Sequence, residues 1–162
     1  MSIRALLDDA RDRLGSVSRE GLGELVVPRR VLGIARPPRI VRRGSAWHLG
    51  VLLLTDGAVL ATGQIVRARA EVRRGYAAES QRERAALAAA ARRGGFGEGE
   101  TVHVGWQPID LDAVAEGTAS GPLSVMDGVP SVRWSAVGGW VPLEGYLSER
   151  IALLEHPEPG AT

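Results

Sequence analysis

The sequence predicts an α+β fold, in which about three helices cover a mainly antiparallel sheet with a long central hairpin. Two Asp-Gly pairs, Asp56-Gly57 and Asp127-Gly128, each lie between β-rich runs, a pattern typical of tight hairpin turns. A doubly wound parallel sheet would need a helix between most successive strands, and few such spacings are present. We expect one domain, residues 1–162, with a loose tail at 156–162.

The central hairpin is predicted for residues 47–73, with its turn at Asp56-Gly57. This pair supplies the two positive-φ positions of a type I′ turn, whose twist matches that of the strands it joins. The first arm is apolar at consecutive positions over residues 49–54, which indicates a strand buried on both faces. We therefore place this hairpin at the centre of the sheet.

The second arm alternates apolar and charged residues, which indicates one buried and one exposed face. The apolar set is Val66, Ala68, Ala70 and Val72, and the charged set is Arg67, Arg69, Glu71 and Arg73. Side chains two apart on a strand stand about 7 Å from one another, close to the spacing of carboxylates on an acidic element and of successive phosphates. We predict that Arg67, Arg69 and Arg73, the arginine row, are the binding residues.

Helices are predicted near residues 3–14, 79–93 and 143–155, with a shorter one after Pro108. Ser2 is placed to cap the first helix. Ser80 and Glu83 have the spacing of a capping box for the second, and Pro142 suits the first turn of the last.

Three prolines, Pro28, Pro37 and Pro38, interrupt residues 25–43 and argue against a continuous central strand there. We expect an irregular strand and an edge strand. Arginines crowd the same stretch, and two explanations stay open: cations that block edge-to-edge aggregation, and a surface that binds a ligand.

The composition excludes several kinds of chemistry. The chain has no cysteine, which excludes disulfides, thiolate metal ligands and cysteine nucleophiles. All 20 basic residues are arginine, and without lysine neither a Ser-Lys dyad nor a Schiff base can form. No cofactor is expected.

No run approaches the roughly 18 apolar residues of a membrane span, and the first residues carry acidic groups where a signal peptide has an apolar core. We expect a soluble, cytoplasmic protein with no membrane partner.

The net charge of +1 conceals an uneven distribution. Residues 1–93 hold 18 arginines against 9 acidic residues, whereas residues 94–162 hold 2 arginines against 10 acidic residues. Mutual neutralisation of the two halves is the simpler explanation, and a separate basic binding surface is the alternative.

The three histidines, His48, His103 and His156, show no spacing typical of metal ligands, so no metal site is predicted. His48 and His103 both fall on predicted strands. Together with Thr55 or Asp56 they supply the enzymatic alternative, a small amidohydrolase.

The positions of the four tryptophans give little support to nucleic-acid binding. Trp106 and Trp134 are interpreted as core anchors, and Trp140 as the exposed one. Base stacking needs aromatic residues interleaved with cations, and only Arg133-Trp134 approaches that pattern. Binding of nucleic acid or another anion is therefore the less favoured alternative.

Segments along nearly the whole chain resemble a family of short proteins of high-GC, actinobacterial-type bacteria, some of which carry the label glutaminase. These segments are RRVLGIARPPRI, WHLGVLLLTDGAVLATG, GYAAESQRERAALAAAARRGGF, GETVHVGWQPIDLDAV and GVPSVRWS. Serine-dependent glutaminases rely on a Ser-x-x-Lys motif, which a lysine-free chain does not contain. The resemblance therefore implies membership of the family and transfers no site residue.

From these observations we expect a non-catalytic module that binds a protein partner or a second copy of itself through the arginine row. The acidic half offers a ready complement to arginine, whereas aromatic residues for stacking are scarce.

Overall fold

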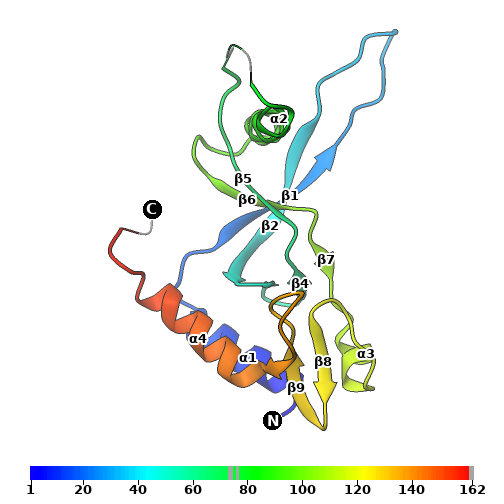
Figure 1. Cartoon of the computed structure of the whole chain (residues 1–162). Coiled ribbons are helices and arrows are strands. Elements are labelled where there is room, and N and C mark those ends of the chain that lie inside the picture. Colours follow the sequence, from blue (N-terminus) through cyan, green and yellow to red (C-terminus); the bar gives the residue numbers. More distant parts are fainter. Residues whose placement is uncertain (73–74, 76, 161–162) are drawn as a thin grey trace. The chain divides into compact units, whose positions relative to one another are not determined.

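The computed structural model describes residues 1–72, 75 and 77–160 and confirms the α+β class (Figure 1). The helices are α1 (Ile3–Leu14), α2 (Glu79–Arg93), α3 (Leu111–Ala115) and α4 (Leu143–Glu155). The strands are β1 (Glu20–Val26), β2 (Arg39–Leu49), β3 (Leu52–Leu54), β4 (Val59–Ala61), β5 (Gln64–Arg67), β6 (Thr101–Val104), β7 (Gln107–Pro108), β8 (Leu123–Met126), β9 (Val129–Val132) and β10 (Val141–Pro142). The three main helices span the predicted residues.

Seven strands pair in the order β5-β6-β1-β2-β3-β4-β7, and a smaller sheet has the order β10-β9-β8. Within the described residues, the parallel pairing joins β1 to β6 and the other strand pairs are antiparallel. The prediction of a mainly antiparallel sheet is therefore confirmed.

Contacts divide the chain into two compact units, each built from separate stretches of sequence. Unit 1 comprises residues 1–19, 47–62 and 107–162, and unit 2 comprises residues 20–46 and 63–106. Strand β2 contributes residues to both. The expectation of a single domain stays a prediction.

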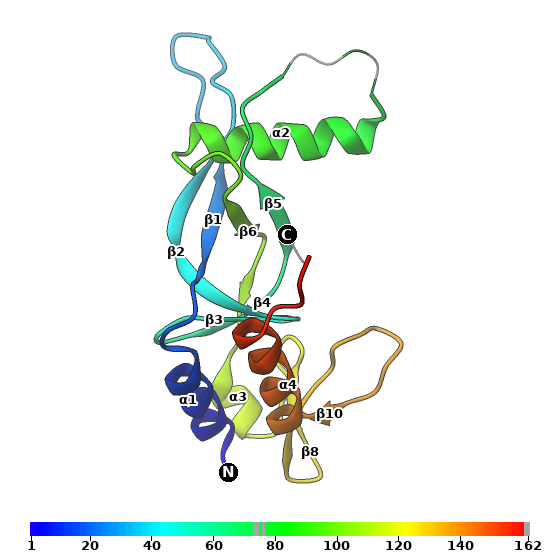
Figure 2. The same cartoon turned by 90° about the vertical axis from the view of Figure 1, so that its left-hand side faces the viewer.

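In unit 1, α1 and α4 lie side by side and bury their apolar stripes in one core (Figure 2). Leu7 and Leu14 of α1 and Ile151 of α4 are fully buried there. Ser2 caps α1 as predicted, because its side chain accepts a hydrogen bond from the backbone N–H of Ala5 at 3.2 Å.

Unit 2 has its own core, in which the second half of α2 covers β5 and β6. Ala89, Ala90 and Ala91 are buried, and Phe96 fills the space beside them. The small alanine side chains let α2 lie close to the sheet. The approach is tightest at Gly94, the C-cap of α2, where a Cβ atom would stand 1.5 Å from the carbonyl oxygen of Ile40 on β2.

The Asp56-Gly57 turn joins β3 to β4, but it is a four-residue loop rather than the predicted type I′ turn. Neither Asp56 nor Gly57 has positive φ. The side chain of Thr55 accepts a hydrogen bond from the backbone N–H of Ala58 at 2.9 Å, which closes the loop without left-handed residues. Asp127-Gly128, by contrast, has φ of 51° and 78°, as a type I′ turn requires.

Both arms of the central hairpin are shorter than predicted. The apolar run 49–54 turns at Gly50, whose φ is 64°, so that β2 pairs back onto β3. The second arm is interrupted after β4, and β5 pairs with β6 instead. The turn at Gly50 was not predicted, because the residues before it in β2 and after it in β3 are both buried and the apolar run therefore looks continuous in the sequence.

Three further sequence predictions are corrected. Strands β1 and β2 lie inside the sheet rather than at its edge, because the prolines fall in the connection between them, residues 27–38. The Ser80–Glu83 capping box is absent, since α2 begins at Glu79 with Ala78 as its N-cap, two residues before the predicted cap at Ser80. Trp134 is 51% exposed rather than a core anchor, because β9 ends at Val132.

No helix among the described residues is long and apolar enough to cross a membrane.

Candidate functional site

The arginine row lies at the end of β5 and just beyond it. Arg67 is the last residue of β5, Arg69 lies two residues further on, and both are exposed. Val66 before Arg67 and Ala68 between the two arginines are buried. The alternation ends there, because Ala70 and Val72 are exposed. Arg73, the third predicted binding residue, lies outside the described residues.

Backbone hydrogen bonds fix the segment that carries these arginines. The N–H of Arg69 donates to the carbonyl of Ala88 in α2 at 3.1 Å. Ala68 donates to the carbonyl of Glu100 at 3.0 Å and accepts from the N–H of Gly99 at 2.7 Å. The segment is therefore held on two sides, and the arginine side chains project from a fixed backbone.

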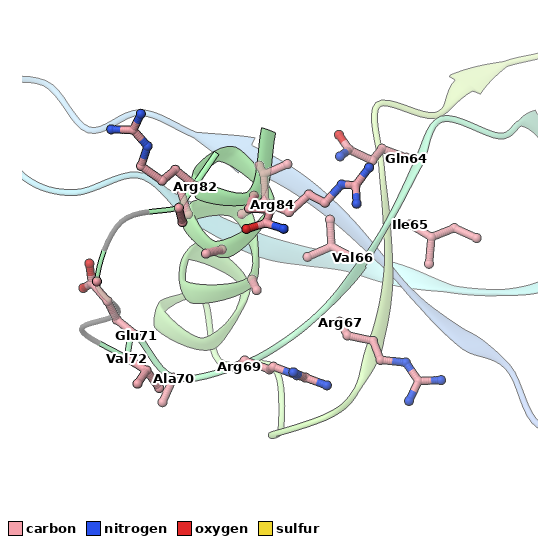
Figure 3. Close-up of a pocket in the computed structure, with 17 residues that line it drawn as sticks. Gln64, Ile65, Val66, Arg67, Arg69, Ala70, Glu71, Val72, Arg82 and Arg84 are labelled. Carbon is pink, nitrogen blue, oxygen red and sulfur yellow. The ribbon is translucent and has the colours of Figure 1, made fainter. Parts of the chain in front are cut away.

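Two more arginines, both from α2, are among the residues that line a pocket beside this segment. A pocket of about 730 Å³ lies between residues 64–72 and the first half of α2, and Arg82 and Arg84 line it together with Arg67 and Arg69 (Figure 3). We call it the arginine pocket. Glu71 is the acidic residue among its described lining, so the lining carries a formal excess of three positive charges.

The rest of the lining is aliphatic or amide. Ile65 and Val72 are 52% and 67% exposed, and Ala85 and Ala86 are exposed on the helix. No described residue buries this half of α2, because its residues 79–86 are all exposed while the buried residues of the helix begin at Ala89. None of the described lining residues is aromatic.

Arg82 and Arg84 were not among the predicted binding residues. The available signal was the first half of the 79–93 helix, where charged residues crowd without an apolar stripe, which is typical of a helix face that no core covers. The sequence did not show that the first half of α2 lies beside the arginine row, because this depends on the path of the chain between β5 and α2.

If the two halves neutralised each other at the arginine row, its partners would be the carboxylates of Glu98, Glu100, Asp110 and Asp112. Glu100 pairs instead with Arg42 at 2.5 Å. Glu98 contacts Arg92 at 3.3 Å and accepts a hydrogen bond of 3.1 Å from the backbone N–H of Ala70, next to Arg69. Asp112 pairs with Arg4, and Asp110 caps α3 by accepting from two backbone N–H groups. Within the described part of the chain, no ion pair involves Arg67, Arg69, Arg82 or Arg84.

The charge imbalance seen along the sequence becomes a difference between the units. Unit 2 contains 14 arginines and 7 acidic residues, and unit 1 contains 6 arginines and 12 acidic residues. Unit 2 therefore has a formal net charge of +7 and unit 1 of −6. The arginine pocket belongs to the basic unit.

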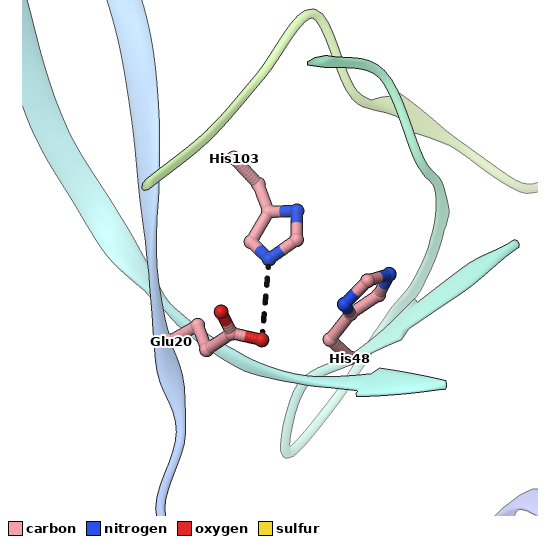
Figure 4. A group of neighbouring side chains, drawn as sticks. All are labelled: Glu20, His48 and His103. Carbon is pink, nitrogen blue, oxygen red and sulfur yellow. Dashed lines mark ion pairs between the residues drawn. The ribbon is translucent and has the colours of Figure 1, made fainter. Parts of the chain in front are cut away.

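His103 lies on β6 and is fully buried in unit 2 (Figure 4). Its Nε2 stands 3.6 Å from a carboxylate oxygen of Glu20 on β1. Sequence reasoning did not identify Glu20, which is 83 positions away along the chain and meets His103 through the parallel β1–β6 pairing. The prediction that the histidines hold no metal stays a prediction, which metal analysis of the pure protein tests.

The other residues of the enzymatic alternative have structural contacts in unit 1. His48 contacts the carbonyl of Gly50 through Nε2 at 2.9 Å. Asp56 accepts two hydrogen bonds from the guanidinium of Arg19, which hold the pKa of Asp56 below its ordinary value. These contacts, with the Thr55 hydrogen bonds, favour a turn-stabilising role for Thr55 and Asp56.

Comparison with known proteins finds no matching family model, curated protein or solved structure. Assignment to the family that the sequence resembles therefore stays a prediction.

Proposed function

We propose that the protein is a non-catalytic binding module and that the arginine pocket of unit 2 is its contact surface for an acidic segment of a protein. The observation that carries the proposal is the grouping of four arginines around one pocket while nearby carboxylates are engaged with other groups. Each of these guanidinium groups can donate charge-assisted hydrogen bonds to a carboxylate, and the excess of positive charge attracts an acidic segment.

The lining favours a protein partner over nucleic acid. Arginine forks pair with carboxylates and phosphates alike, so the cations alone do not discriminate. Exposed Ile65, Val72 and Ala85 suit the aliphatic side chains of an acidic amphipathic segment. The segment belongs either to another protein or to the acidic unit of a second copy.

A labelled peptide rich in glutamate and leucine tests the site. The double variant Arg67→Ala/Arg69→Ala is expected to weaken its binding about tenfold or more, because it removes two charge-assisted contacts. Glu71→Gln is expected to strengthen binding, because it removes a carboxylate from the lining.

The matched control is Arg29→Ala/Arg30→Ala, which removes the same charge from unit 2 outside the pocket. Equal weakening by both double variants would show that net charge alone attracts the peptide and would contradict the proposal. Tighter binding of an oligonucleotide than of the peptide would favour the nucleic-acid alternative. Light scattering of wild type and of Arg67→Ala/Arg69→Ala with no peptide present shows whether a second copy occupies the arginine pocket, because association through this pocket is lost in the double variant.

The amidohydrolase alternative has a separate test. Ammonia release from glutamine by the pure protein, abolished in both His48→Ala and His103→Ala, would contradict a non-catalytic module.

A further inference from the structure

The connection between β1 and β2, residues 27–38, forms a narrow hairpin that we call the finger (Figure 2). At its tip, Val31 and Ile34 exchange two backbone hydrogen bonds of 3.2 and 3.0 Å. The two residues between them, Leu32 and Gly33, have φ of 54° and 76°, as in a type I′ turn. Glycine or asparagine is the ordinary occupant of the Leu32 position, so a leucine held there is a backbone outlier that points to a function.

The finger exposes aliphatic side chains in place of the polar ones that a solvated turn favours. The exposed fractions are 70% for Val27, 51% for Val31, 95% for Leu32 and 69% for Ile34. Neighbouring exposed cations are Arg29, Arg30, Arg36 and Arg39, and no acidic residue occurs between Glu24 and Asp56. A convex apolar tip with cationic sides is complementary to an apolar socket on an acidic surface.

Unit 1 contains such a socket, at the first turn of α4. A pocket of about 530 Å³ is lined by Trp134, Val141, Pro142, Gly145 and Tyr146, together with Glu149 and Arg150. We call it the tryptophan pocket. Its cation is already partnered, since the guanidinium of Arg150 lies 5.2 Å from the ring centroid of Tyr146. Glu144 and Glu149 are exposed on the same helix.

We propose that the protein self-associates, with the finger of one copy inserting Leu32 into the tryptophan pocket of a second copy. The finger belongs to the unit of charge +7 and the tryptophan pocket to the unit of charge −6, so the two surfaces attract one another in separate molecules. Arg30 lies two residues before Leu32 and Arg36 three residues after Gly33, and both are exposed, as are Glu144 and Glu149 on α4. We expect these arginines to pair with the two glutamates of the second copy. The contact does not involve the arginine pocket.

Two variants, one on each side of the contact, are designed to leave the fold intact. Leu32→Asn removes the apolar tip but keeps a residue that tolerates positive φ. Gly145→Leu fills the tryptophan pocket, because a Cβ atom on Gly145 meets nothing within 4 Å and the residue lies in a helix. Circular dichroism and thermal unfolding check that both variants remain folded.

Light scattering and sedimentation of each variant alone and of their mixture test the contact. The wild-type protein is expected to associate, and each variant alone to be monomeric at the same concentration. In a 1:1 mixture the intact finger of Gly145→Leu meets the intact pocket of Leu32→Asn, so a mixed complex is expected to form. A mixture that stays monomeric while the wild type associates would overturn the finger-in-pocket contact.

Other partners of the finger would give different experimental results. A wild type that is monomeric in light scattering at every concentration overturns the inference, even if it still binds the acidic peptide in the arginine pocket, so the two proposals fail separately. Sedimentation of monomeric wild type with phosphatidylglycerol vesicles, lost in Leu32→Asn, would assign the tip to a lipid surface and would also overturn the inference.

Discussion

Gly94 occupies a position that admits no side chain. A Cβ atom there would stand 1.5 Å from the carbonyl oxygen of Ile40 and 2.4 Å from its carbonyl carbon, and both are backbone atoms that cannot move alone. We expect Gly94→Ala to lower the free energy of unfolding by about 1–3 kcal/mol, because α2 must shift away from β2. Denaturant unfolding measures the loss.

Gly145 is the matched control for that substitution. It lies in α4, and a Cβ atom there meets nothing within 4 Å. Gly145→Ala is expected to raise the free energy of unfolding by about 0.5–1 kcal/mol, as alanine does in an exposed helix. Equal effects of the two substitutions would contradict the close approach of α2 to Ile40.

The pairing of Asp56 with Arg19 makes a pH-dependent contribution to stability. The hydrogen bonds from Arg19 hold the folded-state pKa of Asp56 below its ordinary value, so the contribution is present above the unfolded pKa and is lost as pH falls through the folded pKa. We expect Asp56→Asn to lower the denaturant midpoint at neutral pH and to differ less from wild type in strong acid. A difference that grows toward acid pH would show the opposite linkage.

Single residues also mark where sequence reasoning succeeded and failed. Asp127-Gly128 forms the type I′ turn that the Asp-Gly pair predicts, whereas Asp56-Gly57 does not. The deciding residue is Thr55, whose hydroxyl closes the longer loop. An Asp-Gly signal is therefore overridden when a neighbouring side chain offers the backbone another hydrogen bond.

Among the helices, the two N-terminal serines of α1 and α2 have different roles. Ser2 accepts a hydrogen bond from the backbone N–H of Ala5, whereas α2 has no side-chain cap. We expect Ser2→Ala to cost about 1 kcal/mol of unfolding free energy and Ser80→Ala to stay within about 0.5 kcal/mol of wild type. A comparable loss at both positions would mean that α2 begins at Ser80, as the S-x-x-E pattern predicted.

Helices were predicted more closely than strands. The residues of α1, α2 and α4 follow from apolar spacing and from stop signals such as Gly94, which are local in sequence. The breaks at Gly50 and after Ala61 depend on distant partners, since Tyr146 donates a hydrogen bond to the carbonyl of Leu49 across the Gly50 turn. Pairing of β5 with β6 likewise joins segments that sequence periodicity treats separately.

At the scale of the whole molecule, the uneven distribution of charge is visible in the sequence, and the structure shows how it divides between the two units. The imbalance between residues 1–93 and 94–162 predicted either neutralisation or a basic surface. The structure groups the charges into units of +7 and −6 and engages Glu98 and Glu100 with Arg92 and Arg42 rather than with the arginine row. Of the candidate site, Arg67 and Arg69 were predictable from alternation, whereas Arg82, Arg84 and the pocket itself arise from packing of α2 beside β5.

The salt dependence of peptide binding tests the central claim most directly. The dissociation constant of the glutamate- and leucine-rich peptide is measured for wild type and for Arg67→Ala/Arg69→Ala at low and at physiological ionic strength. If the arginine pocket binds acidic segments, wild-type affinity falls as salt rises, because the contacts are charge pairs near solvent, and the double variant shows weaker binding with a smaller salt effect. Equal affinities and equal salt effects in the two proteins would contradict the assignment of the arginine pocket as the binding surface.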